Sequence, residues 1–444
     1  MNVDWRRLLL QVLLAVGVGV LLLFATSTTT QLHERERRIH AGAQREAQSG
    51  DPSAAYLEIV LEASPLAPLS SGFAGIAPSM HLIRLSATRP LSNIDPIEHP
   101  SRRRFGRIDL SFAFLVVLPI ALIPLCYLIY KRCLSKGDLE KLASGKTKFF
   151  DFCVERILLP VLGASGFVLL VTMACLYSSG LRLGSNELLG RVAIWAFLLA
   201  AYLLTWMLLL TYLLLRASSF SSATIQYASI FLLVVILIPQ GMESLLLAVE
   251  RPKGRLPLIV ERRQALNELR RDDQAGIDRF FQRQGYKALD WSQPLTGPQA
   301  SAIENLRVEE KIAPRLRQFE DNVSKLDQMA LWSSWLSPFM TAQYGLDDLA
   351  GTGLARYSRF RGDAIAFHEQ WRKYTLGYLA KRQFLDYDGL RYAPKFKQGT
   401  EELGDVLGSA LVKCAYFSIL CILLLVAIVK RLSKVLPQRK RAAR

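Results

Sequence analysis

The chain has 444 residues, of which 51% are hydrophobic, and its formal net charge is +17. Its apolar residues are concentrated in unbroken blocks of about 18 residues or more, which are typical of membrane spans rather than of soluble helices and strands. This distribution excludes a soluble enzyme and a disordered chain, and the position of the basic residues, given below, argues against nucleic-acid binding.

Six blocks are long enough to cross a membrane as helices, since about 20 residues span the roughly 30 Å of hydrocarbon. They cover residues 8–25, 110–130, 158–177, 192–215, 223–242 and 410–429. The first block fits an uncleaved signal anchor better than a cleaved signal peptide, because its apolar run is longer than a usual signal-peptide core. We therefore predict an all-α polytopic membrane protein with six transmembrane helices.

The charge distribution predicts the orientation of these spans. With six spans both termini lie on one side, together with the connectors 131–156 and 216–222. These segments, with residues 1–7 and 430–444, carry 17 basic and 5 acidic residues. Such an excess marks the cytoplasmic side, so the protein is predicted to be a multi-pass protein of the bacterial inner membrane with cytoplasmic N- and C-termini. The basic tail at 430–444 then lies beside anionic lipid, although nucleic-acid binding is the alternative.

Two large segments, 27–109 and 243–409, are predicted to lie in the periplasm as mainly helical insertions. Neither contains any of the six cysteines, so neither has a disulfide framework,. Within the first, 56–63 is expected to form a short helix, and the Ser/Pro/Gly-rich stretch that follows is expected to be a loop. In the second, one apolar stripe runs from Leu266 to Phe281. A longer one, with aromatic residues, runs from Leu346 to Tyr378 at helical spacing and is interpreted as core rather than as a ligand site,.

The sequence contains few patterns that indicate catalysis. Gly145-Lys146-Thr147 resembles the end of a phosphate-binding loop, but Glu140 stands where the first glycine is required,. His33, Glu36 and His40 could share a helix face and bind a metal, although solvated surface histidines are the alternative. The predicted spans have no charged residue near mid-membrane, which argues against a proton relay. Three proline positions, at 119, 124 and 160, are expected to bend spans two and three, and Pro239-Gln240-Gly241 is expected to end the fifth span or turn it back.

Three stretches resemble type-2 permease subunits of bacterial ABC transporters. The first leads into the second span at residues 99–110, the second is KGDLEKLAS at 136–144, and the third combines LSP at 336–338 with DLAGTGLAR at 348–356. The resemblance is to a branch that carries a conserved uncharacterised domain between the last two spans. The residues that carry its signature are Asp109, Ser337, Pro338, Gly351, Thr352, Gly353, Arg356 and Phe360.

The resemblance implies a transport subunit that is not itself an enzyme. Such a subunit binds no cofactor, because ATP and Mg²⁺ are held by a separate cytoplasmic ATPase, and it pairs with a second permease subunit. A short helix after the second span docks on the ATPase as an amphipathic segment in a groove. Its residues here are Gly137, Asp138, Leu139, Leu142 and Phe149. An ordinary loop beside lipid is the alternative interpretation of this segment.

This connector also departs from the family pattern. Asp138 stands where threonine is usual, the acidic residue before Gly137 is missing, and Glu155-Arg156 replaces a usual Gly-Lys. These departures led to the hypothesis that the chain is one half of a heteromeric pair. The resemblance favours transport in the export direction. Membrane lipid and a periplasmic protein are expected as further binding partners, and nucleic acid is not. The alternative function is a membrane scaffold whose helical periplasmic segments recruit partners without a transport path.

Overall fold

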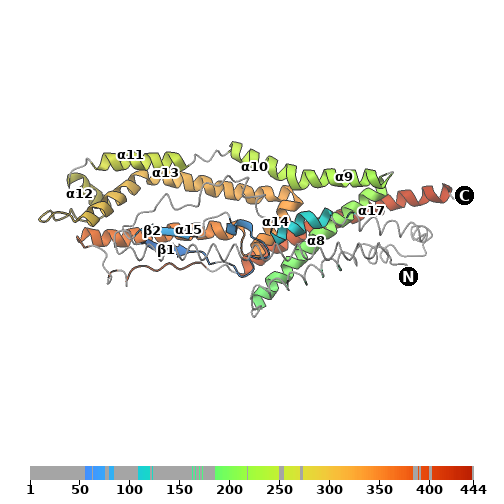
Figure 1. The fold of residues 1–444 in the computed structure, drawn as a ribbon, viewed down its shortest axis with the longest axis horizontal. Coiled ribbons are helices and arrows are strands. Elements are labelled where there is room, and N and C mark those ends of the chain that lie inside the picture. Colours follow the sequence, from blue (N-terminus) through green and yellow to red (C-terminus); the bar gives the residue numbers. More distant parts are fainter. Residues whose placement is uncertain are drawn as a thin grey trace, which may run out of the picture.

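The computed structural model describes residues 56–62, 64–75, 80–84, 109–120, 186–217, 219–249, 255–270, 274–383, 392–399 and 403–442, with isolated positions at 123, 163, 166, 170, 173 and 389. The described part is mainly helical and elongated, with the apolar helices toward one end and a helical domain toward the other (Figure 1). The predicted spans at 8–25 and 158–177 and the connector 131–156 lie outside the described residues, apart from single positions in the second of these. The same holds for His33, Glu36 and His40.

Within the described ranges, three helices are long and apolar enough to cross a membrane. They run over Asn186–Arg216, Phe220–Leu246 and Gly404–Arg431. The first of them is α8, Asn186–Arg216, and the last belongs to α17, Leu403–Ala442. These helices confirm the apolar blocks predicted at 192–215, 223–242 and 410–429 as membrane-length helices. The second span is described over its first part only, as a shorter apolar helix at Leu110–Ile120.

The contacts between these helices fix their relative directions. Tyr202 of α8 packs edge-on against Phe417 of α17 at 5.8 Å between ring centroids, and the Thr205 Oγ1 and Cys421 Sγ atoms lie 3.3 Å apart. Because the residue numbers rise together, α8 and α17 are parallel. Helix α9, Phe220–Leu232, follows α8 after a short connection and runs back in the opposite direction.

Two prolines inside apolar helices are accommodated by π-turns. The π-turn η2, Ala113–Val117, precedes Pro119, and η4, Leu233–Leu237, precedes Pro239. Proline lacks an N–H, so a carbonyl in the preceding turn loses its helical partner. The Tyr202 hydroxyl donates to the Leu115 carbonyl at 2.8 Å, and the Ser337 hydroxyl donates to the Val234 carbonyl at 2.7 Å.

The expectation that Pro239-Gln240-Gly241 ends or reverses the fifth span is wrong. Helix α10, Ile238–Val249, continues directly from η4 through these residues. A π-turn provides the room that the proline ring needs, and the Ser337 hydroxyl satisfies the carbonyl that the proline leaves free,. The helix therefore continues through the proline, because a hydroxyl from another part of the chain replaces the missing backbone hydrogen bond.

The segment between α10 and α17 forms a helical domain. Its elements are α11 (Arg255–Leu269), α12 (Gln274–Arg283), α13 (Gly297–Ser333), the 3-10 turn η5 (Ser334–Leu336), α14 (Pro338–Leu349) and α15 (Leu354–Ala380). The core of this domain contains Phe280, Phe281 and Trp371, all almost fully buried. The aromatic stripe is thus core, as predicted, but it belongs to two helices, because the chain turns between α14 and α15. The Leu266–Phe281 stripe is likewise divided between α11 and α12.

The first insertion differs from its prediction. Residues 56–63 were expected to be helical, but Tyr56–Val60 form a strand, β1, that pairs antiparallel with β2, Met80–Arg84. The sequence YLEIV is rich in β-branched and aromatic residues, and in β1 Ile59 is buried,. The described part of this insertion therefore contains a two-stranded sheet, and the turns and the 3-10 turn η1, Gly72–Gly75, lie between its two strands. The expected helical character of this insertion is not seen there.

Candidate functional site: a buried polar junction

Buried polar side chains gather where the apolar helices meet the helical domain. They come from the turn after β1, the start of the second span, α14 and the turn after it. We call them the junction cluster: Ser70, Ser71, Asp109, Ser111, Gln343, Asp347 and Thr352. Apart from Gln343, which is half-buried, each is buried. Buried polar groups of this kind must be hydrogen-bonded to one another or to the backbone.

Asp109 is the anchor of the cluster. Its Oδ2 accepts from the Ser71 N–H at 2.9 Å and from the Ser71 hydroxyl at 2.7 Å. Its Oδ1 accepts from the Phe112 N–H and the Ser111 hydroxyl, both at 2.8 Å, so it also caps the helix that begins the second span. Two N–H groups and two hydroxyls therefore share this one carboxylate as their acceptor.

Asp347 lies at the opposite end of a chain of hydroxyls. The Ser70 hydroxyl contacts Asp347 Oδ1 and lies 2.9 Å from the Ser111 hydroxyl, which in turn bonds to Asp109. The amide of Gln343 donates to Asp347 Oδ1 at 2.9 Å. Two carboxyl groups that belong to different parts of the sequence are therefore linked through two serines.

The number of hydrogens in this chain indicates which carboxyl group is protonated. Three oxygen–oxygen contacts join Asp347, Ser70, Ser111 and Asp109, and each requires one hydrogen,. The two hydroxyls supply two, so the third must come from a carboxyl group. Burial raises the pKa of Asp347 well above its usual value, and the nearby Asp109 and Asp348 carboxylates raise it further, whereas hydrogen bonds from Ser70 and Gln343 oppose the shift. The hydrogen count and the raised pKa of Asp347 both assign the extra proton of this chain to Asp347.

The turn between α14 and α15 closes the cluster. The Thr352 hydroxyl donates to the Ser70 carbonyl at 2.9 Å, and the Phe73 N–H donates to the Thr352 carbonyl at 2.9 Å. Gly351 has φ +68°, and a Cβ there would lie 2.6 Å from Ser64 Oγ. A side chain at this position is disfavoured both by the backbone conformation and by the close approach of the first insertion.

A buried ion pair lies beside the cluster. Lys413 Nζ of α17 is 2.5 Å from Asp348 Oδ2 and also donates to Ser409 Oγ at 3.1 Å. The side chain of Lys413 is only 6% exposed. A charge this deeply buried requires its partner, because an unpaired lysine would be strongly destabilising.

The structure brings most of the predicted signature residues to this junction. Ser337 and Pro338 are exceptions at the opposite end of α14, where Ser337 caps the helix and Pro338 occupies its first turn. A Cβ at Gly353 would lie 2.0 Å from Asp348 Oδ1. Phe360 instead is buried in the core of the helical domain, edge-on to Phe396 at 6.1 Å. The coupling-helix residues Gly137, Asp138, Leu139, Leu142 and Phe149 lie outside the described residues.

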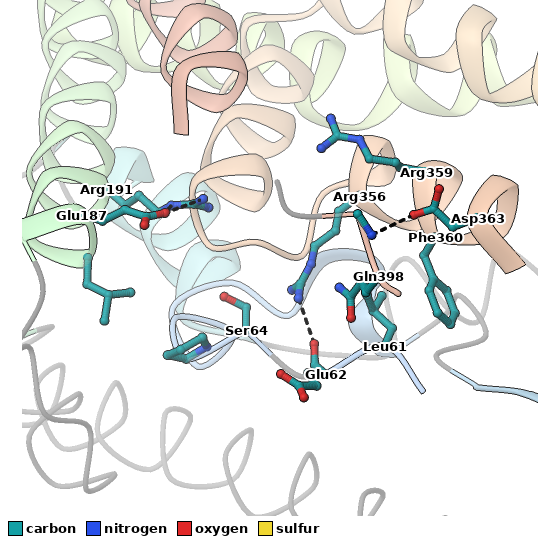
Figure 2. Close-up of a pocket in the computed structure, with 13 residues that line it drawn as sticks. Leu61, Glu62, Ser64, Glu187, Arg191, Arg356, Arg359, Phe360, Asp363 and Gln398 are labelled. Atoms are coloured by element: carbon teal, nitrogen blue, oxygen red, sulfur yellow. Dashed lines mark hydrogen bonds and ion pairs between the residues drawn. The ribbon is translucent and has the colours of Figure 1, made fainter. Parts of the chain in front are cut away.

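A cavity of about 540 Å³, lined by both charged and apolar side chains, opens next to the junction. Figure 2 shows Glu187 and Arg191 of α8 on one side and Arg356 of α15 on the other, with the turn after β1 below. Arg356 donates to the Gly351 carbonyl at 2.5 Å and to the Glu62 carbonyl at 2.9 Å. This guanidinium therefore joins the α14–α15 turn to the first insertion, which gives the signature arginine a structural role at the cavity wall.

Among the described residues, no group of three or more His, Cys, Asp or Glu side chains is placed to hold a metal ion. The two aspartates of the junction cluster and the neighbouring Asp348 each have their own partners: Asp109 faces two serines, Asp347 faces Ser70 and Gln343, and Asp348 faces Lys413. The junction cluster thus connects the first insertion, the second span and α14, and its chain of hydroxyls includes one extra proton.

Residues 255–398 match the family model described as Domain of unknown function (DUF3526). The DUF3526 segment begins with α11 and ends shortly before α17, so it comprises the helical domain between two membrane-length helices. Searches of curated proteins and of solved structures find no match. Much of the junction's signature, including the α14–α15 turn, thus lies in the DUF3526 segment, whereas Asp109 and Lys413 lie outside it.

Sequence reasoning missed five of the seven residues of the junction cluster: Ser70, Ser71, Ser111, Gln343 and Asp347. Ser70, Ser71 and Gly72 were assigned to a loop, although Ser70 is fully buried. Gln343 and Asp347 were not identified as site residues, although their spacing of four residues places them on one face of a helix. The uncharged run before Asp347 was the available signal, since a carboxyl group at the end of such a run is typically bonded or neutral when buried.

Proposed function

We propose that the protein is the membrane-spanning permease subunit of an ATP-driven ABC transporter of the export type, and that a separate cytoplasmic subunit hydrolyses ATP. The helix directions support this proposal. Phe114 lies 5.8 Å from Trp195, and Leu115 accepts from Tyr202, so the second span runs parallel to α8. Spans two, four and six in the predicted order should be parallel and span five opposite, and these contacts agree with that order.

The observation that carries the proposal is the attachment of the second span at the junction. This span begins at Asp109, whose carboxylate bonds to the first insertion, and Ser111 links it to α14. The predicted coupling segment 131–156 follows the other end of the same span. A displacement of that segment by a cytoplasmic ATPase would therefore move a helix that is bonded directly to the periplasmic domain.

The proposal is tested by purification from native membranes and identification of the bound subunits. An ATPase with a phosphate-binding loop should co-purify with the wild-type protein. The double variant Leu139→Glu/Leu142→Glu should lose it, because these side chains are predicted to dock. Lys141→Glu is the matched control and should retain the ATPase, since Lys141 lies in the same segment but is not among the residues predicted to dock. Wild-type protein that binds no such ATPase would refute the proposal.

A membrane scaffold is the second candidate, and one observation favours it. Several serine and threonine hydroxyls in the described spans bond to a carbonyl of their own helix rather than line a path. Thr205 donates to the Ala201 carbonyl at 2.9 Å, and Ser418 donates to the Cys414 carbonyl at 2.9 Å. Stable periplasmic partners without an ATPase in the same purification would support the scaffold.

The heteromeric pairing inferred from the connector is tested separately. We infer that a second, different permease subunit completes the transporter. Purified protein reconstituted with the ATPase alone should then show no ATP-dependent transport. An active homodimer would contradict this inference while leaving the permease function intact.

A further inference from the structure

The helical domain contains a segment with the composition of a membrane segment. Residues 328–346, QMALWSSWLSPFMTAQYGL, include no Asp, Glu, Lys or Arg. They form the end of α13, the turn η5 and most of α14. An uncharged run of this length is unusual for a solvated surface hairpin, because exposed turns are normally polar.

Three contacts place this hairpin deep among the membrane-length helices. The Ser337 hydroxyl bonds to the Val234 carbonyl, and the Trp335 ring lies 5.7 Å from that of Tyr416. A Cβ on Gly345 would lie 2.5 Å from Leu198. In Figure 1 the end of α13 and α14 correspondingly overlap the span bundle.

The rise per residue of an α-helix gives the depth of these contacts below the outer ends of the helices. Val234 is twelve residues from Leu246, the end of its apolar helix, and Tyr416 is twelve residues from Gly404. At about 1.5 Å per residue, each contact lies roughly 18 Å along the helix from its outer end. Helices of 27 and 28 residues exceed a hydrocarbon core of about 30 Å by some 5–6 Å on each side,. The contacts therefore lie roughly 12 Å inside the hydrocarbon, within one leaflet.

The polar groups of the hairpin are arranged as lipid requires. In hydrocarbon each hydroxyl and free carbonyl must find an internal partner. Ser333 donates to the Ala330 carbonyl at 2.9 Å, and Ser334 donates to the Leu331 carbonyl at 2.6 Å. The Thr341 hydroxyl donates to the Ser334 carbonyl at 2.8 Å. The serines of this sequence thus cover backbone carbonyls within the hairpin or on the neighbouring span.

The large side chains that point away from the protein are apolar. Trp332 is 76% exposed and Leu336 is 60% exposed. We propose that residues 331–341 form a re-entrant hairpin that enters the outer leaflet of the membrane, and that Trp332 and Leu336 contact lipid acyl chains. The DUF3526 segment is then anchored in the bilayer at its own hairpin as well as by the flanking spans. This inference depends on the membrane-length helices and not on the transport function.

The test uses the wild-type protein in lipid nanodiscs. Phospholipids that carry a diazirine near the middle of the acyl chain are photolysed, and adducts are located by peptide mass spectrometry. In parallel, hydroxyl radicals generated in the water phase oxidise accessible side chains. Tyr392 is the matched control, because it is an aromatic residue of the helical domain that is 78% exposed.

Adducts are expected on the peptide that contains Trp332 and Leu336, and Trp332 should be oxidised several-fold more slowly than Tyr392. Tyr392 should carry no acyl adduct. Oxidation of Trp332 as fast as that of Tyr392 would place the hairpin in water and overturn the proposal. Protection of Trp332 without an acyl adduct would overturn it as well, because a protein surface rather than lipid would then cover the hairpin.

Discussion

Two isosteric substitutions distinguish the roles of the junction aspartates. If Asp347 holds the extra proton of the hydroxyl chain, then Asp347→Asn replaces one neutral group by another. Asp109→Asn instead removes a carboxylate that accepts four hydrogen bonds. We expect Asp109→Asn to destabilise the protein strongly and Asp347→Asn to have a small effect.

The magnitude follows from the partners of each group. An amide in place of the Asp109 carboxylate presents an NH₂ toward donors, so at least one buried N–H or hydroxyl, from Ser71 or Phe112, loses its acceptor. A buried donor left unsatisfied costs about 1–3 kcal/mol, and a hydrogen bond to a charged group contributes a similar amount, so we expect a loss of about 3 kcal/mol. At Asp347 the amide can still donate to Ser70, and only the contact with Gln343 must rearrange, at a cost of about 1 kcal/mol or less,.

The assay is denaturant or thermal unfolding of the full chain in nanodiscs, followed by near-UV circular dichroism. Asp405→Asn is the control, because this carboxylate is 68% exposed and its pair with Arg359 is long, at 3.7 Å. An exposed substitution of this kind should change stability by less than about 0.5 kcal/mol. If Asp347→Asn proves as destabilising as Asp109→Asn, the assignment of the proton to Asp347 is wrong.

Three further predictions test the same structure. Burial raises the pKa of Asp347 above its unfolded value of about 3.9, so the native state binds the extra proton,. The stability of the wild type relative to Asp347→Asn should therefore fall as the pH rises above about 4 and level off above the native pKa. Unfolding at several pH values measures this difference, and a pH-independent difference would contradict the prediction. Tyr202→Phe should lower the free energy of unfolding by about 1 kcal/mol, because it leaves the Leu115 carbonyl unbonded,. The loss should be smaller in a Pro119→Ala background, where the helix itself can supply an N–H to this carbonyl. A double-mutant cycle measures the coupling between the two positions, and additive effects would contradict the prediction. Gly351→Ala should destabilise the protein by about 1–2 kcal/mol or more, because Gly351 has a positive φ,. Gly362 lies on α15 with open space around it, so Gly362→Ala should stabilise the protein by about 0.5–1 kcal/mol,. Unfolding of the two variants measures both changes.

The apolar helices could be predicted from the sequence because their signal is local. An uninterrupted apolar run has few alternatives to a membrane-length helix, and the predicted block at 192–215 lies within α8, Asn186–Arg216,. The error at Pro239 has a non-local cause. Whether a proline ends a helix depends on whether something else bonds the carbonyl it leaves free, and here that partner is Ser337, which is 103 residues from Val234.

The junction cluster could be predicted only in part for the same reason. The signature turn and Asp109 were identified through the family resemblance, but their partners were not. Ser70 and Asp347 are 277 residues apart, and no local periodicity relates them. The short strand β1 was misassigned because its partner β2 lies about twenty residues away, and strand formation depends on that pairing rather than on propensity alone,.

The polar character of the junction has a mechanical consequence. An apolar interface between the second span, the first insertion and α14 could slide by small steps at modest cost, whereas hydrogen-bonded buried groups are satisfied only in a defined arrangement. Separation of these segments would expose the Asp109 carboxylate and several serines together, each at a cost of about 1–3 kcal/mol if unsatisfied. The junction should therefore move as one body, and any motion of the second span should reach the DUF3526 segment as a rigid displacement. Flexibility is then expected elsewhere, in contacts that do not pass through Asp109.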